Sequence, residues 1–281
     1  MRKFGALVCA VVLSAAAAFP AVSVKLTGGA VFLFGNDYTA GVRGTYESLK
    51  ASYENVTGSP GSLTFGTSGA AEVIVPLDEM LSLGVGAGVI QASADNVFGY
   101  SWWTYSGTES FAPRLTLIPI TINMHYLRPL GKALDLDVFA GAGAYLMRFR
   151  CESRATSSFF GYDVRKTFSA QEAIFGLQLG IALELRLFPH AALVLQSEGR
   201  VAKSKYVKGD WTVEESWFLG SRRSEGTDAL FWAYNKTDAT GTYRQAEFSV
   251  AEPSDAAYEN VRKGTLDISG ISASAGIKIS F

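Results

Sequence analysis

The ionisable residues that could do chemistry in this chain lie where apolar and polar side chains alternate. An alternation of period two places successive side chains on opposite faces of a β-strand. Six charged residues therefore share a predicted face with small or polar neighbours: Glu72, Glu184, Arg186, Glu198, Arg200 and Lys278. This set could form a polar path for small solutes or a network of ion pairs that fills a barrel interior. We expect the network, since a buried charge without a partner is costly.

The sequence shows little sign of catalysis or metal binding. Of the two histidines, His190 falls in a predicted turn and His125 faces the predicted interior beside Asn123. An enzyme acting on lipids at a barrel surface would need an outward histidine with a serine partner, and neither is found. Two histidines without a nearby cysteine argue against zinc. We therefore expect no catalytic residues, no metal site and no enzymatic activity.

A glycine-rich stretch, Gly84-Val85-Gly86-Ala87-Gly88, resembles a dinucleotide-binding turn only superficially. That fingerprint requires a strand, a glycine turn and then a helix. Here the glycines alternate within a predicted strand and no helix follows. Small side chains facing a narrow interior explain them better, so no cofactor is expected.

Aromatic residues gather in two long segments between predicted strands. The tryptophans among them are Trp102, Trp103, Trp211, Trp217 and Trp232. Tryptophan and tyrosine dominate binding hot spots, so one interpretation is a surface for an extracellular ligand. The alternatives are an aromatic girdle at a membrane interface and loops that pack on one another.

Eight strands are predicted to position these residues. They run over about 24–34, 63–75, 80–93, 112–126, 135–150, 170–187, 191–206 and 265–281. The alternation is clear where Ile118, Ile120 and Ile122 are interleaved with Thr121 and Asn123. No apolar stripe of period 3.6 with end caps stands out, so no helix is expected. The sequence therefore predicts an all-β fold.

The predicted connections alternate in length. Short ones lie near 76–79, 127–134 and 188–190, and long ones near 35–62, 94–111, 151–169 and 207–264. Transmembrane barrels have short periplasmic turns and long extracellular loops, with apolar side chains facing lipid. The pattern predicts a closed antiparallel up-and-down barrel of about eight strands, with both termini in the periplasm.

The N-terminus predicts export. Arg2 and Lys3 precede an apolar stretch, Phe4 to Ala18, which is followed by small residues. This is the layout of a signal peptide over residues 1–23, cleaved somewhere in 18–23. The barrel domain would then span 24–281. Cys9 falls in the leader, so Cys151 is expected to be an unpaired surface thiol.

The composition excludes a nucleic-acid partner and fits a protein that is in contact with more than one apolar environment. Charged residues make up 18% of the chain, below the ~25% that is usual in soluble domains. The formal net charge is −1 and no basic stripe is visible, whereas nucleic-acid binding needs one.

Several stretches resemble the small outer-membrane β-barrel family, which includes OmpA-like, OmpX-like, OmpW-like and opacity-type proteins. The resemblance is carried by 117–123, 139–145, 175–188 and 269–281. The chain ends with Ile277, Ile279 and Phe281 at alternate positions. They resemble the terminal signal that the barrel-insertion machinery recognises. The resemblance implies the outer membrane as location, with periplasmic chaperones, the insertion machinery, membrane lipid and lipopolysaccharide as partners.

We expect an integral outer-membrane barrel without catalytic activity, acting in envelope structure or through its exposed loops. A narrow porin-like channel for small or apolar solutes is the alternative. A lipid-modifying barrel enzyme and a soluble periplasmic lipid-binding barrel fit the sequence less well.

Overall fold

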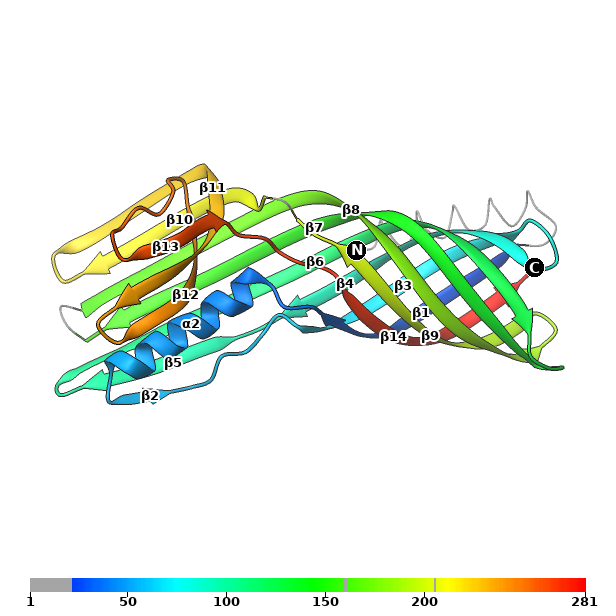
Figure 1. The fold of residues 1–281 in the computed structure, drawn as a ribbon, viewed down its shortest axis with the longest axis horizontal. Helices are drawn as coiled ribbons and strands as arrows, with labels where there is room; N and C mark the ends of the chain where they lie inside the picture. The colour runs from blue at the N-terminus through cyan, green and yellow to red at the C-terminus, as the bar shows by residue number, and fades with distance from the viewer. Residues whose placement is uncertain (1–21, 159–160, 205) are drawn as a thin grey trace.

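The computed structural model describes residues 22–158, 161–204 and 206–281, so most of the predicted signal peptide lies outside it. The described chain folds into one antiparallel sheet of 14 strands and a single helix (Figure 1). The all-β prediction is confirmed. The prediction of about eight strands is too low for the whole sheet, which has 14 strands.

Eight of the strands are linked by pairing in a cycle. In pairing order they are β1 (Ser23–Leu33), β3 (Phe65–Pro76), β4 (Leu81–Ser93), β6 (Tyr105–Pro129), β7 (Leu134–Ser157), β8 (Tyr162–Phe188), β9 (Ala191–Ala202) and β14 (Gly270–Ser280). Each pairs antiparallel with the next, and β14 pairs with β1. The part of the sheet in which all eight strands take part is called the ring below. The eight strands correspond one to one with the eight predicted strands.

The other elements lie at one end of the ring, in a part of the molecule called the cap. It comprises α2 (Asp37–Ser52), β2 (Asn55–Thr57), β5 (Asn96–Trp102), β10 (Lys208–Trp217), β11 (Gly220–Asp238), β12 (Gly241–Ser249) and β13 (Tyr258–Lys263). The long strands β6, β7 and β8 run from the ring into the cap (Figure 1). Strand β5 pairs with β6, and β10 pairs with β8. The cap is therefore continuous with the ring sheet.

The short connections 77–80, 130–133 and 189–190 lie at the end of the ring opposite the cap. There the backbone N–H of Phe281 donates to the carbonyl of Val22 at 2.9 Å. The first and last described residues therefore lie together at that end. The longer connections, except that between β7 and β8, build the cap.

The segments expected to be long loops are mostly regular structure. Residues 151–169 are the largest correction, because β7 continues to Ser157 and β8 begins at Tyr162. The segment 207–264 holds β10 to β13, and 94–111 holds β5 and the start of β6. Pairing satisfies the backbone N–H and C=O groups of these segments, which explains why they are not irregular.

Helix α2, within the expected loop 35–62, was not predicted. The side chain of Asn36 caps its start by accepting a hydrogen bond from the Thr39 N–H at 2.8 Å. Tyr38, Val42 and Leu49 are buried on one helical face. A Cβ at Gly44 would overlap the carbonyl oxygen of Arg244, so glycine allows the helix to lie against β12.

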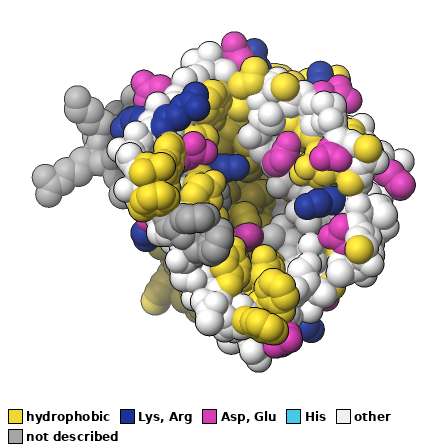
Figure 2. All heavy atoms as spheres, turned by 90° about the vertical axis from the view of Figure 1, so that its left-hand side faces the viewer, with side chains coloured by type: hydrophobic (Ala, Val, Ile, Leu, Met, Phe, Trp, Pro, Cys, Tyr) yellow, Lys and Arg dark blue, Asp and Glu magenta, His cyan; other side chains and the backbone are white. Residues whose placement is uncertain are grey.

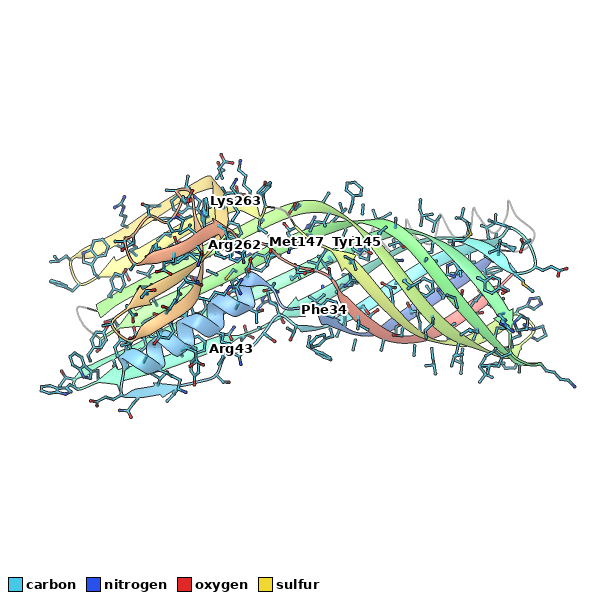
Figure 3. The ribbon with its side chains drawn as sticks, in the orientation of Figure 1. Phe34, Arg43, Tyr145, Met147, Arg262 and Lys263 are labelled. Atoms are coloured by element: carbon cyan, nitrogen blue, oxygen red, sulfur yellow. The ribbon has the colours of Figure 1, made fainter. Side chains whose placement is uncertain are left out.

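The main apolar core lies in the cap and at its junction with the ring. Tyr38 of α2 contacts the rings of Phe149, Phe231 and Phe248, which come from three strands. Figure 3 places Tyr145 and Met147 of β7 at the junction, and both are fully buried. The ring below this junction has a polar interior instead.

Candidate functional site

A cluster of four buried ionisable side chains occupies the interior of the ring. Glu72 of β3 lies 2.7 Å from Lys25 of β1 and 3.0 Å from Nε2 of His125 of β6. Nδ1 of His125 lies 2.9 Å from Asp137 of β7. All four side chains are at least nine-tenths buried. The cluster therefore ties four strands together across the interior.

Both ring nitrogens of His125 face a carboxylate. An imidazole can satisfy two carboxylates only by donating from both nitrogens, which is its doubly protonated form. In that form the cluster holds two positive and two negative charges. Neither nitrogen is left to accept a proton from a nucleophile. The geometry therefore fits a structural ion pair better than a general base.

A chain of amide hydrogen bonds extends this cluster toward the cap. The amide of Asn123 donates to Glu72 at 2.6 Å, and that of Gln178 donates to Asn123 at 2.6 Å. The hydroxyl of Tyr145 then donates to Gln178 at 3.0 Å. Gly84 lies against the same cluster, because a Cβ there would meet Glu72 and His125. The glycine alternation in β4 therefore makes room for larger interior side chains.

The other predicted interior charges lie in three places. Lys278 donates to Glu184 at 2.9 Å, and Arg186 binds Asp135 through two bonds of 2.6 and 2.7 Å near the end away from the cap. Arg200 and Glu198 are 3.9 Å apart, closer to the cap. The guanidinium of Arg200 also donates to the carbonyl of Ile268 at 3.1 Å.

All six charged residues predicted for the interior thus have an ionic partner. Lys25, Asp135 and Asp137 were not predicted as interior charges, and His125 was expected to have no role. Each occupies the same alternating face as the predicted residues, so the pattern could have included them. Their partners depend on the strand register, which the sequence does not give.

A small cavity separates the Arg200 pair from the Glu72 cluster. Its volume is about 70 Å³, and Lys25, Gln196, Glu198 and Arg200 contribute to its wall. Such a cavity holds only a few water molecules. A larger cavity of about 310 Å³ lies at the end away from the cap, beside Glu184, Arg186 and Lys278.

The outer face of the ring carries an apolar band. On β8 the exposed side chains are Phe175, Leu177, Leu179, Ile181 and Leu183, with Phe175 at 82% exposure. Other ring strands add similar exposed side chains, including Leu26, Phe65, Val85, Ile122, Leu195 and Ile271. Ile277, Ile279 and Phe281, which were predicted to form a C-terminal signal, are also exposed here. Contiguous apolar surface of this extent marks a membrane or protein contact.

Asp37, at the first turn of α2, ties the helix to two other strands of the cap, β12 and β13, and to the segment that leads to β14. Its carboxylate accepts hydrogen bonds from Arg244 at 2.5 Å, from both terminal nitrogens of Arg262 at 2.7 Å, and from the N–H of Thr265 at 3.0 Å. Partial burial raises the pKa of Asp37, but these donors outweigh burial and lower the pKa overall.

Cys151 is buried and not at the surface as expected. Its Sγ lies 3.1 Å from the hydroxyl of Tyr38, beneath α2. Burial raises the pKa of the thiol to about 11. A thiol with a pKa so far above neutrality is unreactive while α2 covers it.

The five predicted tryptophans divide into two groups. Trp232 is buried in β11 and donates to the carbonyl of Ser249, and Trp211 of β10 packs against the cap core. Trp102 and Trp103 are exposed at the turn between β5 and β6, while Trp217 ends β10 at a second hairpin tip. Trp211 and Trp232 thus pack within the cap, whereas Trp102 and Trp103 are exposed and a contact surface there stays a prediction.

The tip of the β5–β6 hairpin is an aromatic cluster. Trp103 is 90% exposed and 6.3 Å from Trp102, measured between ring centroids. Tyr53 stacks on Tyr100 at 4.4 Å beside them. The tip of β10–β11 exposes Phe218 and Leu219 in the same way. Figure 2, seen from the cap end, shows apolar side chains around the rim among charges of both signs.

Among the described residues, no group of three His, Cys, Asp or Glu side chains is placed to hold a metal ion. Within the same ranges, no helix is long and apolar enough to cross a membrane.

Comparison with known proteins yields distant structural likeness only. No protein-family model and no curated protein sequence matches the chain. A major outer membrane protein from Thermus thermophilus is 15% identical, with a TM-score of 0.39, over 93% of this chain and 99% of that one. The outer membrane protease OmpT from Escherichia coli is 8% identical, with a TM-score of 0.35, over 93% and 97%. Similarity at this level assigns neither a family nor an activity to the chain.

Proposed function

We propose that this chain is an integral outer-membrane protein whose ring spans the bilayer and whose cap projects from the cell surface. The observation that supports this most is the combination of a cyclic strand pairing with an outward apolar band and a charged interior. Only structures that pair all their backbone groups internally can cross a bilayer, and a closed barrel is one of the two solutions. The short connections would then be periplasmic.

The interior argues for a structural plug, not an open channel. The Glu72 cluster, the amide chain and the Arg200 pair all lie in the ring interior. They leave a cavity of only about 70 Å³ between them. An eight-strand ring is just wide enough for side chains to fill, which agrees with this arrangement. We therefore propose a non-conducting, non-catalytic barrel.

The cap supplies the contacting surface in this proposal. Two separate hairpin tips, β5–β6 and β10–β11, present exposed large apolar side chains at the same end of the molecule (Figure 1). Trp103 has a φ of +54°, a backbone conformation that favours glycine. The turn therefore carries an exposed aromatic residue in spite of backbone strain. Separate tips suit an extended apolar surface, such as an apposed lipid layer, better than a small ligand.

Heat-modifiability tests the spanning ring. Detergent extracts of outer membranes are run on SDS gels with and without boiling, and the same protein is placed in planar bilayers. We expect different mobilities for the boiled and unboiled protein and no discrete conductance steps. Soluble fractionation with a single mobility would contradict the membrane proposal. Regular conductance steps from a heat-modifiable protein would favour the narrow channel instead.

Changing Trp102 and Trp103 to alanine tests the contacting surface. The protein in lipid nanodiscs is sedimented with protein-free phosphatidylcholine vesicles. We expect the double variant to associate at least about tenfold more weakly, because burying one large apolar side chain stabilises by ~1.5–3 kcal/mol. Tyr206→Ala is the control, since Tyr206 is an exposed aromatic residue away from the tips. Equal association of the double variant and the unmodified protein would contradict a contacting role for this tip.

A further inference from the structure

A group of arginines lies on the outer face of the sheet, directly above the apolar band on the cap side. Arg114 of β6 and Arg150 of β7 are register partners. Arg148 is two residues from Arg150 along β7 and points the same way, since residues i and i+2 share a face. All three are exposed. They are called the arginine group below.

The arginine group holds more positive charge than its neighbours balance. Side chains directly opposite on paired antiparallel strands have Cβ atoms ~5 Å apart, and like charges there are destabilising. Arg150 lies 2.8 Å from Glu152, but Glu152 also binds Arg165 at 3.2 Å. Among the described residues, no carboxylate pairs with Arg114 or Arg148. The neighbours on the adjoining strands in this register are Ser93, Gln91, Gln171 and Ser169, which are all uncharged.

The next row toward the ring is apolar. The register places Leu146 beside Ile118, one step below the Arg148 row. Leu146 is exposed, as are Val89 of β4 and Phe175 of β8. A ligand that fits both rows carries phosphate charge at one end and hydrocarbon at the other. Arginine binds phosphate through two parallel hydrogen bonds, so neighbouring guanidinium groups suit phosphate well.

We propose that Arg114, Arg148 and Arg150 bind the phosphate headgroups of lipids in the membrane leaflet on the cap side. The inference rests on the proposed membrane function and adds a lipid class to it. Lipid phosphate would relieve the repulsion between Arg114 and Arg150, while the acyl chains lie on the apolar band below. Phosphate without an acyl chain would use only half of this surface.

The test uses the protein in an uncharged maltoside detergent. Dioleoyl phosphatidic acid, dioleoylglycerol and inorganic phosphate are each titrated, and bound species are counted by native mass spectrometry. The triple change Arg114→Gln, Arg148→Gln and Arg150→Gln is compared with Arg43→Gln, Lys50→Gln and Arg222→Gln. The second set removes the same charge from exposed residues of the cap. Both variants must show the heat-dependent mobility of the unmodified protein.

We expect the first triple variant to bind phosphatidic acid about tenfold more weakly or worse, because charge-assisted hydrogen bonds are lost. Dioleoylglycerol should bind all three proteins equally, and the control variant should match the unmodified protein. Equal phosphatidic acid binding by both triple variants would overturn the inference. So would inorganic phosphate that binds as tightly as the lipid. A protein that shows no heat-dependent mobility would overturn the membrane proposal itself, whereas a heat-modifiable protein without lipid preference overturns only this inference.

Discussion

Replacing Glu72 with glutamine should destabilise the ring by about 3–5 kcal/mol, the usual cost of breaking a buried ion pair by removing one partner. The change leaves Lys25 and a doubly protonated His125 with only Asp137 as a counter-charge. Both cations are nearly inaccessible to water. Urea unfolding in lipid vesicles, followed by tryptophan fluorescence, measures the free energy of unfolding. Glu225→Gln is the matched control, because its ion pair with Arg223 is exposed and should contribute ~1 kcal/mol or less.

A second substitution separates charge imbalance from lost packing. Adding Lys25→Met to Glu72→Gln leaves one positive and one negative charge, His125 and Asp137. The double variant should therefore recover about 1–3 kcal/mol relative to Glu72→Gln alone, since residues in one network are not additive. If the free energy of unfolding of Glu72→Gln lies within ~0.5 kcal/mol of that of the unmodified protein, water solvates Lys25 and His125. That outcome would contradict the filled interior and favour the channel.

The ring was predictable because each of its strands separates two environments. Period-two alternation in stretches such as 117–126 places isoleucines outward and Thr121, Asn123 and His125 inward. The same signal continued beyond the predicted ends. Met147, Phe149 and Cys151 alternate with Arg148, Arg150 and Glu152, and the structure buries the first set and directs the second outward. Charged residues such as Arg148 and Arg150 can form the outer face of a strand. On that basis the alternation predicts that β7 and β8 extend into the expected loop.

The cap was less predictable because its elements depend on contacts distant in sequence. Tyr38, Val42 and Leu49 have helical spacing, but the glycines at 41 and 44 weaken helix propensity, so the pattern was faint. Those glycines matter only once β12 lies against α2, some 200 residues later. Similarly, the alternation identified Glu72 as an interior residue but not Lys25 or His125 as its partners. Partners follow from register, which many distributed contacts determine.

Acidification should release α2 from β12 and β13 through Asp37. The pKa of Asp37 is lowered from its ordinary value of 3.8, so its contribution to stability is fully present above about pH 3.8. That contribution is lost as the pH falls through the lower folded-state value, because the protonated carboxyl no longer balances Arg244 and Arg262. Asp37→Asn removes the same charge at every pH. Both arginines are 47% exposed, which limits the expected cost to about 1–3 kcal/mol.

Cys151 reports this release directly, since Tyr38 of α2 covers its thiol. In the mature chain it is the sole cysteine if the signal peptide is cleaved as predicted. 4,4′-Dithiodipyridine reacts with thiols even in acid, so it can follow exposure from pH 7 to pH 2. At pH 7, Asp37→Asn should be labelled about tenfold faster or more, as local opening becomes easier. Asp228→Asn is the matched control, because the Asp228 carboxylate forms an exposed ion pair with Lys208, far more exposed than Asp37. In the unmodified protein labelling should accelerate only below about pH 3.8, whereas Asp37→Asn should show no such step. An equally sharp acid step in Asp37→Asn would assign the release to another carboxylate.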